Sequence, residues 1–252
     1  MSDTHPIYGL HAVLAVLEQD PAQVQRLWLD TRRRDRRMQD IQRAARAAGI
    51  EVQAVAREEL TARAGTDRHQ GAVAEVAGGS LRSEKDLLEA VEAATRPLLL
   101  VLDGVQDPHN LGACLRSADA AGALGVVVPR DRACGLTPTV RKVAAGAAES
   151  VPLYQVTNLA RALKGLQQAG IWCLGLDAAG TQTLFEEDLS GPVALVLGAE
   201  GSGLRRLTRE TCDTLVALPM AGAVASLNVS VTAGIALFEA VRQRQGRGTR
   251  GK

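Results

Sequence analysis

The composition of this 252-residue chain bounds its architecture: 46% of the residues are hydrophobic, only 2% are aromatic, and 29 basic residues nearly balance 28 acidic ones. A chain of this length buries a sizeable core without disulfides or metals, and we expect two domains. The widely spaced cysteines argue against a zinc site or a disulfide framework, and the lack of a signal-type core or a run of ~20 apolar residues predicts a cytoplasmic protein without a membrane partner.

The first third of the chain alternates between helical and strand patterns. Apolar residues recur there at helical spacing or at every second position, in short segments bounded by turn residues. In chain order we expect a helix over 8–19, a strand over 24–30, a helix over 36–48, a strand over 50–56, a helical turn over 58–64 and a strand over 71–77. These elements predict a small α/β domain over 1–78, followed by a linker over 79–96 that contains a helix with a polar face.

Two basic clusters are present although the net charge is only +1. The segment Arg32–Arg37 is all arginine except for one aspartate, and residues 242–252 include several basic side chains and no acid. Net charge hides such clustering, and both segments are suited to contact phosphate groups. We expect residues 246–252 to form a basic, disordered tail.

From residue 97 onward the strand patterns become continuous apolar runs, which are typical of strands buried on both faces of a parallel sheet. The runs cover 98–102, 124–128, 171–176, 193–197 and 215–218. Because helical patterns lie between them, we expect an α/β domain over 97–245 with a mostly parallel sheet. Ligands of such sheets gather at the carboxyl ends of the strands, and three loops there have unusual residues.

The first loop follows the run over 98–102 and leads into a helix that Asn110 is placed to cap. Farther along this helix, Arg116 has small neighbours such as Gly112 and Ala113, as if space were left for a long side chain or a ligand. An arginine in such a gap is suited to bind phosphate through its planar guanidinium. A capped helix with a solvent-exposed arginine remains the alternative interpretation.

The second loop, 198–203, joins a strand to a helix through three glycines. Its G-x-x-G-x-G spacing differs from that of a dinucleotide-binding turn, and no carboxylate follows the next strand, which argues against a nicotinamide dehydrogenase. A phosphate-binding P-loop and the G-x-S-x-G elbow of hydrolases are also missing. Glu200, amid these glycines, is either a solvated carboxylate or a site residue, and we favour the second.

In the third loop, 219–228, small and polar residues interrupt a hydrophobic strand end and lead directly into a helix. Gly222 and the neighbouring alanines allow a backbone to approach a ligand closely. Ser226 and Asn228 place a hydroxyl and an amide at the start of the helix, where unpaired N–H groups collect. We expect this segment to form the floor of a ligand and reaction site.

Together the three loops resemble the three motifs of the SpoU-type branch of the SPOUT RNA methyltransferases. The residues that carry the resemblance are Asp107-Pro108-x-Asn110-x-Gly112-Ala113-x-x-Arg116-Ser117-Ala118, then Leu197-Gly198-x-Glu200-Gly201-x-Gly203, then Leu218-Pro219-Met220-x-Gly222-x-x-x-Ser226-Leu227-Asn228-Val229-Ser230. The segments Tyr8–Val13 and His69–Gly71 are similar to the accessory RNA-binding domain of this family, which is similar to a ribosomal protein of the L30e type.

The resemblance implies a fold that no periodicity would suggest, a parallel α/β sheet whose C-terminal segment forms a deep trefoil knot. It also implies S-adenosylmethionine as methyl donor, with Gly198, Leu218 and Leu227 contacting it largely through backbone groups and with no metal required. The residues implied to line the reaction site are Asn110, Arg116, Glu200, Ser226 and Asn228. Family dimers use surfaces of small residues, so an alanine stripe on the expected helix over 226–244 predicts a homodimer.

The implied activity is 2′-O-methylation of a guanosine ribose in 23S rRNA, with the N-terminal domain holding the RNA. The alternatives are a tRNA 2′-O-methyltransferase, disfavoured by the N-terminal segments, and a non-catalytic RNA-binding or ribosome-assembly factor, disfavoured by the full set of motif residues. Because an arginine keeps its proton in proteins, we expect Arg116 to hold a phosphate and stabilise the developing alkoxide rather than to act as a base.

Overall fold

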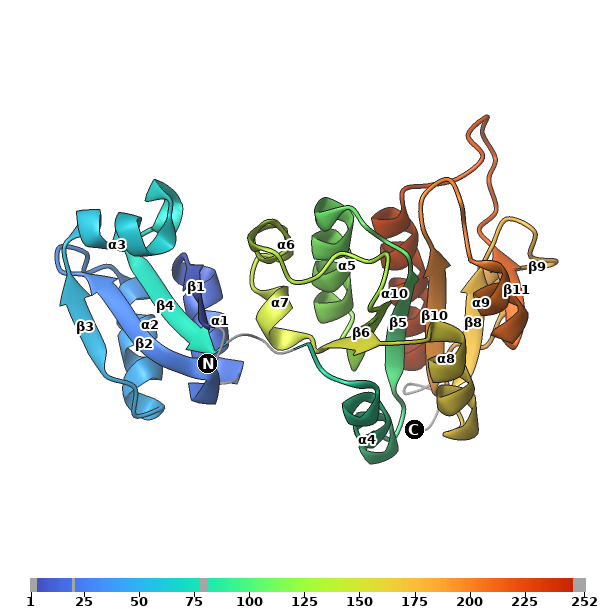
Figure 1. The fold of residues 1–252 in the computed structure, drawn as a ribbon, viewed down its shortest axis with the longest axis horizontal. Helices are drawn as coiled ribbons and strands as arrows, with labels where there is room; N and C mark the ends of the chain where they lie inside the picture. The colour runs from blue at the N-terminus through green and yellow to red at the C-terminus, as the bar shows by residue number, and fades with distance from the viewer. Residues whose placement is uncertain (1–3, 20, 78–80, 247–252) are drawn as a thin grey trace. The chain divides into compact units, whose positions relative to one another are not determined.

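The computed structural model describes residues 4–19, 21–77 and 81–246. The chain divides into two compact units, residues 1–80 and residues 81–252, and each unit has its own hydrophobic core (Figure 1). No helix within the described ranges is long and apolar enough to cross a membrane. The expected basic tail over 246–252 lies, apart from Gly246, outside the described residues.

The first unit is a four-stranded sheet in the order β1-β4-β2-β3, in which only β2 and β3 are parallel. Its elements are β1 (Thr4–Tyr8), α1 (Leu10–Gln19), β2 (Val24–Asp30), α2 (Arg36–Ala47), β3 (Val52–Val55), α3 (Arg57–Ala64) and β4 (Ala72–Ala77). All the expected elements are present within a few residues. The additional strand, β1, lies at the edge of the sheet, where Pro6 costs no ladder hydrogen bond, and its short mixed sequence has no period-2 signal.

Helices cover both faces of this sheet. On one face α1 and α2 contribute Val13, Met38 and Ile41 to a core shared with Leu27 of β2. On the other face Leu60 of α3 packs with Trp28 and Val73. Alternate residues of β2 therefore enter different cores, which is the physical origin of its strand periodicity.

The basic segment Arg32–Arg37 covers the connection after β2 and the first two residues of α2, and it presents most of its charge to solvent. One member is an exception, because the guanidinium of Arg33 pairs with Asp35 and donates to the main-chain oxygen of Gln70. Asp35 in turn caps α2 by accepting a hydrogen bond from the backbone N–H of Met38. Arg33 thus braces the segment, and the exposed arginines are Arg32, Arg34, Arg36 and Arg37.

His69 lies at the centre of the turn that precedes β4, and its side chain is buried. Its Nδ1 accepts a hydrogen bond of 3.1 Å from the backbone N–H of Gly71, so that the proton of the neutral ring is on Nε2. Nε2 then donates to the hydroxyl of Thr61, 3.1 Å away, whose own proton goes to the main-chain oxygen of Arg57. Burial, followed by the positive charge of Arg57, lowers the pKa of His69 below its ordinary value.

This lowered pKa predicts an acid-sensitive fold for the first unit. The contribution of neutral His69 to the free energy of unfolding is fully present above pH 6.5, the ordinary value for the ring, and is lost as the pH falls through the lowered folded pKa. Thermal melting of wild-type protein and of His69→Gln, measured from neutral to acidic pH, should show a steeper loss in the wild type. Parallel pH profiles would contradict the prediction.

The second unit is a seven-stranded parallel sheet in the order β7-β6-β5-β10-β8-β11-β9. Its elements are α4 (Glu84–Ala93), β5 (Leu98–Asp103), α5 (Pro108–Ala120), β6 (Gly125–Pro129), α6 (Pro138–Ala144), α7 (Ala147–Ser150), β7 (Leu153–Val156), α8 (Leu159–Gln168), β8 (Trp172–Leu176), β9 (Gln182–Thr183), β10 (Val193–Gly198), α9 (Arg206–Thr211), β11 (Thr214–Ala217) and α10 (Val229–Gly246). The expectation of a parallel α/β sheet is confirmed. The strands β7 and β9 are additions, each too short for a periodic signal.

Both faces of this sheet are covered by helices, as the continuous apolar runs predict. Along β5, Leu98, Leu100 and Leu102 enter a core with α5, α6, α7 and α10. The intervening Leu99 and Val101 enter a second core with α4 and α8. A strand of this kind has no polar side to expose, so it shows no alternation in sequence.

The helix α4 differs from the linker expected over 79–96. Leu87 is fully buried and Val91 is 3% exposed, and both belong to the core that α8 shares with the sheet. Ser83 and Asp86 form a capping box that fixes where α4 begins. The polar face that favoured a linker is therefore the solvent side of a packed amphipathic helix.

The alanine stripe of α10 does not lie on the surface, so it does not supply the contact on which the expectation of a homodimer was based. Ala233, Ala236 and Ala240 are each fully buried within the same chain, in the core where α10 packs beside α5. Small residues here allow close approach between the two helices of one protomer. The exposed apolar side chains of α10 are instead Val231 and Phe238, each 49% exposed.

Arg244, in the last turn of α10, has a structural role rather than the phosphate contact expected for the basic segment over 242–252. Its guanidinium donates hydrogen bonds to four main-chain oxygens just before the amino ends of the parallel strands β5 and β10, those of Arg96, Pro97, Leu189 and Gly191. Burial lowers the pKa of Arg244. Arg242 is likewise occupied by an ion pair of 2.7 Å with Glu239.

Candidate active site

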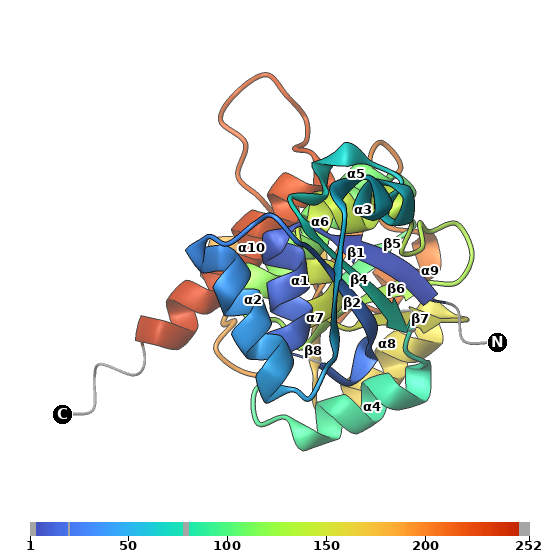
Figure 2. The ribbon, with the colours of Figure 1, turned by 90° about the vertical axis from the view of Figure 1, so that its left-hand side faces the viewer.

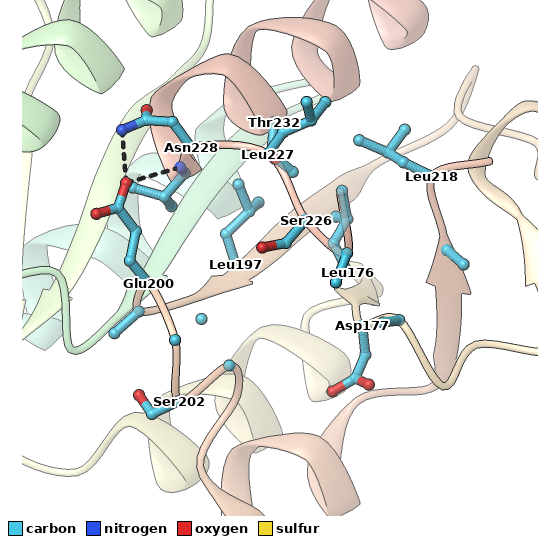
Figure 3. Close-up of a pocket in the computed structure, with 18 of the residues that line it drawn as sticks. Leu176, Asp177, Leu197, Glu200, Ser202, Leu218, Ser226, Leu227, Asn228 and Thr232 are labelled. Atoms are coloured by element: carbon cyan, nitrogen blue, oxygen red, sulfur yellow. Dashed lines mark hydrogen bonds between the residues drawn. The ribbon is translucent and has the colours of Figure 1, made fainter. Parts of the chain in front are cut away.

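The three loops of interest meet at the carboxyl edge of the second sheet. There β10 lies between β5 and β8, and the register places Gly198 opposite Asp103. A pocket of about 820 Å³ opens at this edge, lined by the ends of β8 and β10, the loop 199–203 and residues from both ends of the segment 218–228 (Figure 3). Such volumes are typical of small-molecule sites.

Gly198 is required by a close backbone approach. A Cβ atom on it would lie 2.0 Å from the carbonyl carbon of Gly203, because the loop turns back over the end of β10. The turn is held by a hydrogen bond of 2.9 Å from the N–H of Gly203 to the oxygen of Ala199. Gly201 and Gly203 have φ values of 76° and 64°, in the left-handed region that glycine adopts without strain.

A polar cluster joins the three loops beside the pocket. The side-chain amide of Asn228 donates to Oε1 of Glu200, as Figure 3 shows. The same amide also donates, over 2.9 Å, to Oδ1 of Asn110. Oε1 of Glu200 also accepts from the backbone N–H of Val229, 3.4 Å away. Since Val229 begins α10, the carboxylate lies at a helix N-terminus, where the helix dipole favours negative charge.

Asn228 caps α10 as well, because its Oδ1 accepts hydrogen bonds from the backbone and the hydroxyl of Ser230. Asn110 is buried, and the cap of its own helix is supplied by Asp107, whose carboxylate accepts from the backbone N–H of His109. The cap expected of Asn110 is therefore made by Asp107. Asn110 is left to take part in the cluster with Asn228.

The third loop does not form the expected floor of the site, because most of it is exposed to solvent. Residues 219–226 are all exposed, and they project from the unit as the orange-red loop of Figure 2. Only its ends line the pocket, through Leu218 and Met220 on one side and 225–228 on the other. The apolar walls come from Leu176, Leu197, Leu218 and Leu227, and Ser226 faces the same space (Figure 3).

Arg116 does not join this cluster in the protomer. It is exposed on α5, outside the pocket lining, and forms no hydrogen bond or ion pair with the residues that the structure describes. Six residues at about 100° each separate it from Asn110, so the two side chains leave α5 on different sides. The space expected beside it is partly filled, because a Cβ on Gly112 would lie 2.7 Å from the Cβ of Val143 in α6.

Two further ionic residues line the pocket although the sequence patterns did not single them out. Asp177 follows β8 and forms an ion pair of 2.6 Å with Arg209 of α9. Neither residue lies in one of the three motifs, and only the position of Asp177 at a strand end distinguishes it. Within the described ranges, no three His, Cys, Asp or Glu side chains gather in a way that would hold a metal ion.

Two family models match the chain, and they correspond to its two compact units. Residues 97–238 match the model of the SpoU rRNA methylase family, which is more than half of the chain. The chain belongs to the SpoU rRNA methylase family. Residues 6–80 match a second model, described as RNA 2′-O ribose methyltransferase substrate binding, which covers the first unit.

Members of the SpoU family are similar to this chain over nearly its whole length. A protein of Ralstonia nicotianae named 23S rRNA (guanosine-2′-O-)-methyltransferase RlmB is 57% identical over 245 residues, covering 97% of this chain and 98% of its own. The protein of that name in Pseudomonas putida is 53% identical over 248 residues, covering 97% and 99%. The crystal structure of the SpoU methyltransferase AviRb from Streptomyces viridochromogenes with AdoMet matches with a TM-score of 0.78 and 27% identity, covering 96% of this chain and 91% of that chain.

Proposed function

We propose that this SpoU-family chain transfers a methyl group from S-adenosylmethionine to the ribose 2′-hydroxyl of a guanosine in 23S rRNA, in the cytoplasm. The observation that carries the proposal is the cluster of Asn110, Glu200 and Asn228 at the mouth of the leucine-walled pocket. Polar acceptors and donors thereby border a cavity suited to an amphipathic donor molecule. The names of the nearly full-length relatives support the choice of 23S rRNA.

The pocket fits S-adenosylmethionine by its chemistry. Leucine side chains on both sides suit the aromatic ring of the donor, and Gly198, Leu218 and Leu227 all line the pocket, where their backbone groups offer polar contacts. When bound, the donor supplies an electrophilic methyl group on a sulfonium.

The chain's own contribution is alignment of the hydroxyl and stabilisation of charge. Asn228 fixes one carboxylate oxygen of Glu200, and Oε2 makes no hydrogen bond with the described residues, which leaves it to accept one from a ribose hydroxyl. Asn110 and Asn228 orient the sugar, and Ser226 lies on the same rim. Oε2 of Glu200 would take up the hydroxyl proton as the ribose oxygen accepts the methyl group, so that the proton passes to this carboxylate.

We assign to Arg116, which stands apart from the cluster in the protomer, the role of the cation that holds the phosphate next to the target ribose and stabilises the developing alkoxide. Arg116→Lys keeps the charge but removes the planar fork, and we expect turnover to fall at least about tenfold. The dissociation constant for S-adenosylmethionine should stay unchanged, because Arg116 lies outside the pocket lining. Near-normal turnover of the variant would contradict the role of the fork.

We further propose a homodimer that uses the exposed face of α10. Val231 and Phe238 are seven residues apart, so they share one side of the helix, and both are half exposed. A paired helix surface of this kind would cover them. Sedimentation of wild-type protein and of Phe238→Glu would test the assignment, with a monomeric variant as the expected result.

We also propose a knotted C-terminal segment and a kinship of the first unit with ribosomal proteins. A trefoil knot in the C-terminal segment is supported by the path of the chain, since β11 lies beyond β8 whereas α10, which follows it, packs beside α5 at the other side of β10. A kinship of the first unit with ribosomal proteins of the L30e type agrees with its four-stranded α/β architecture. We assign RNA binding to this unit, over residues 1–78, through its exposed arginines.

Transfer of labelled methyl groups from S-adenosylmethionine tests the function directly. Separated rRNA and tRNA from cells that lack the enzyme serve as substrates, and the ribose-methylated position is then mapped. Label in a guanosine of 23S rRNA is the expected result. Label in tRNA alone would favour the tRNA methyltransferase, and failure to bind S-adenosylmethionine would favour a non-catalytic RNA-binding factor.

A further inference from the structure

The carboxyl edge of the second sheet has an aspartate on each side of Gly198. Asp103 of β5 is the register partner of Gly198, and on the other side Leu176 of β8 is the partner of Leu197, so that Asp177 follows at the same level. The loop 199–204 rises from between these two aspartates. It then leads into α9, which carries Arg205 at its N-cap and Arg209 one turn later.

Arg205 returns to the first aspartate. Its guanidinium forms an ion pair with Oδ1 of Asp103, and its backbone N–H donates over 2.9 Å to Oδ2. The side chain of Asp103 is fully buried, so both of its oxygens depend on this one residue, 102 positions along the chain. Removal of the cation from a buried ion pair strongly destabilises the folded state, because it leaves an unpaired buried carboxylate.

Arg209 returns to the second aspartate. Its Nη2 lies 2.6 Å from Oδ2 of Asp177, and Oδ1 of Asp177 accepts a hydrogen bond of 2.9 Å from the N–H of Ala179. The side chain of Asp177 is only 7% exposed, and both partners line the pocket. Figure 3 shows Asp177 on the opposite side of the pocket from Glu200.

We propose that these two ion pairs, called the edge pairs from here on, are positioning pairs for the loop 199–204. The Asp103–Arg205 pair anchors the loop to β5, and the Asp177–Arg209 pair holds α9 against β8 and thereby sets the width of the pocket and its affinity for the methyl donor. This inference rests on the proposed function for the identity of the ligand. Arg209 and Asp177, which lie outside the three motifs, thus affect donor binding by setting the geometry of the pocket.

The test is a double-mutant cycle on the Asp177–Arg209 pair in the full-length chain, and its readout is the dissociation constant for S-adenosylmethionine, measured by calorimetric titration. Asp177→Asn and Arg209→Gln should each weaken binding about tenfold, the effect of losing one charge-assisted hydrogen bond. The double variant should bind no more weakly than either single variant, because one interaction is lost in all three. Thermal melting verifies that each variant is folded.

Arg206→Gln is the matched control. Arg206 lies on the same helix and pairs with Glu210 over 2.9 Å, but both side chains are mostly exposed and lie outside the pocket. The affinity of the Arg206→Gln variant for S-adenosylmethionine should equal that of the wild type. Should Asp177→Asn fail to fold, Arg209→Lys serves in its place, and its affinity should lie between those of wild type and Arg209→Gln.

Three outcomes would overturn the inference. The first is wild-type affinity for the donor in folded variants of Asp177 and Arg209, and the second is a double variant whose loss of affinity equals the product of the two single losses. The third is an equal loss of affinity in the Arg206 control. For the Asp103–Arg205 pair, Arg205→Gln should lower the melting temperature. An unchanged melting temperature would overturn the proposal that this pair anchors the loop. A wild-type chain that fails to bind S-adenosylmethionine would instead contradict the proposed function. The two failures are thus distinguished by the wild-type titration alone.

Discussion

Replacement of Gly198 by alanine is expected to abolish binding of S-adenosylmethionine and to destabilise the second unit. The added Cβ would lie 2.0 Å from the carbonyl carbon and 2.3 Å from the oxygen of Gly203. These are backbone atoms, and the loop that carries them is tied on both flanks by Asp103 and Asp177, so it has little freedom to move away. Overpacking of this kind costs about 1–3 kcal/mol or more.

The measurements are a calorimetric titration with S-adenosylmethionine and a thermal melt. Gly191→Ala is the matched control, because Gly191 precedes the same strand, β10, and nothing lies within 4 Å of the position its Cβ would take. The control should bind and melt like the wild type. Wild-type binding by Gly198→Ala would show that the loop is more adaptable than its contacts indicate.

Removal of residues 1–80 is expected to abolish methylation of 23S rRNA and to leave the affinity for S-adenosylmethionine unchanged. The pocket and the polar cluster lie wholly within the second unit, and the two units share no core residue. What the truncated chain lacks is the RNA grip that we assign to the first unit. The readouts are label transfer to rRNA and a titration with the methyl donor.

A full-length variant separates loss of charge from loss of the domain. Replacement of Arg32, Arg34, Arg36 and Arg37 by glutamine removes the exposed cations and keeps Arg33, which braces the segment against Gln70. Each lost phosphate contact should reduce the salt dependence of RNA binding by about one unit of slope. Undiminished methylation by either variant would refute RNA binding by this unit.

Much of the second unit could be predicted because its strands are buried on both faces. The apolar runs at β5, β6, β8, β10 and β11 are continuous for this reason, and each lies within a residue or two of its expected bounds. The family motifs then added the site residues, of which Glu200, Asn110 and Asn228 do meet. Their roles in the reaction remain predictions.

The local patterns predicted the right type of structure for two helices but the wrong packing partner. The polar face of α4 indicated a linker, and the alanines of α10 indicated a contact between protomers, yet both helices pack within one unit. Helical periodicity shows which residues share a face. It does not show which partner that face contacts, because the partner comes from elsewhere in the chain.

The sequence by itself determined the parallel α/β class, the two-unit division and the three loops that line one edge, because burial on both faces and turn chemistry are local properties. Only the tertiary structure decided that Asn110 is bonded to Asn228, 118 residues away, and that Asp103 and Asp177 hold Arg205 and Arg209 on either side of Gly198. It also decided that Arg116 stands apart from this cluster in the protomer. Strand order, which brings β10 between β5 and β8, sets these pairings, and strand order is a property of the whole sheet.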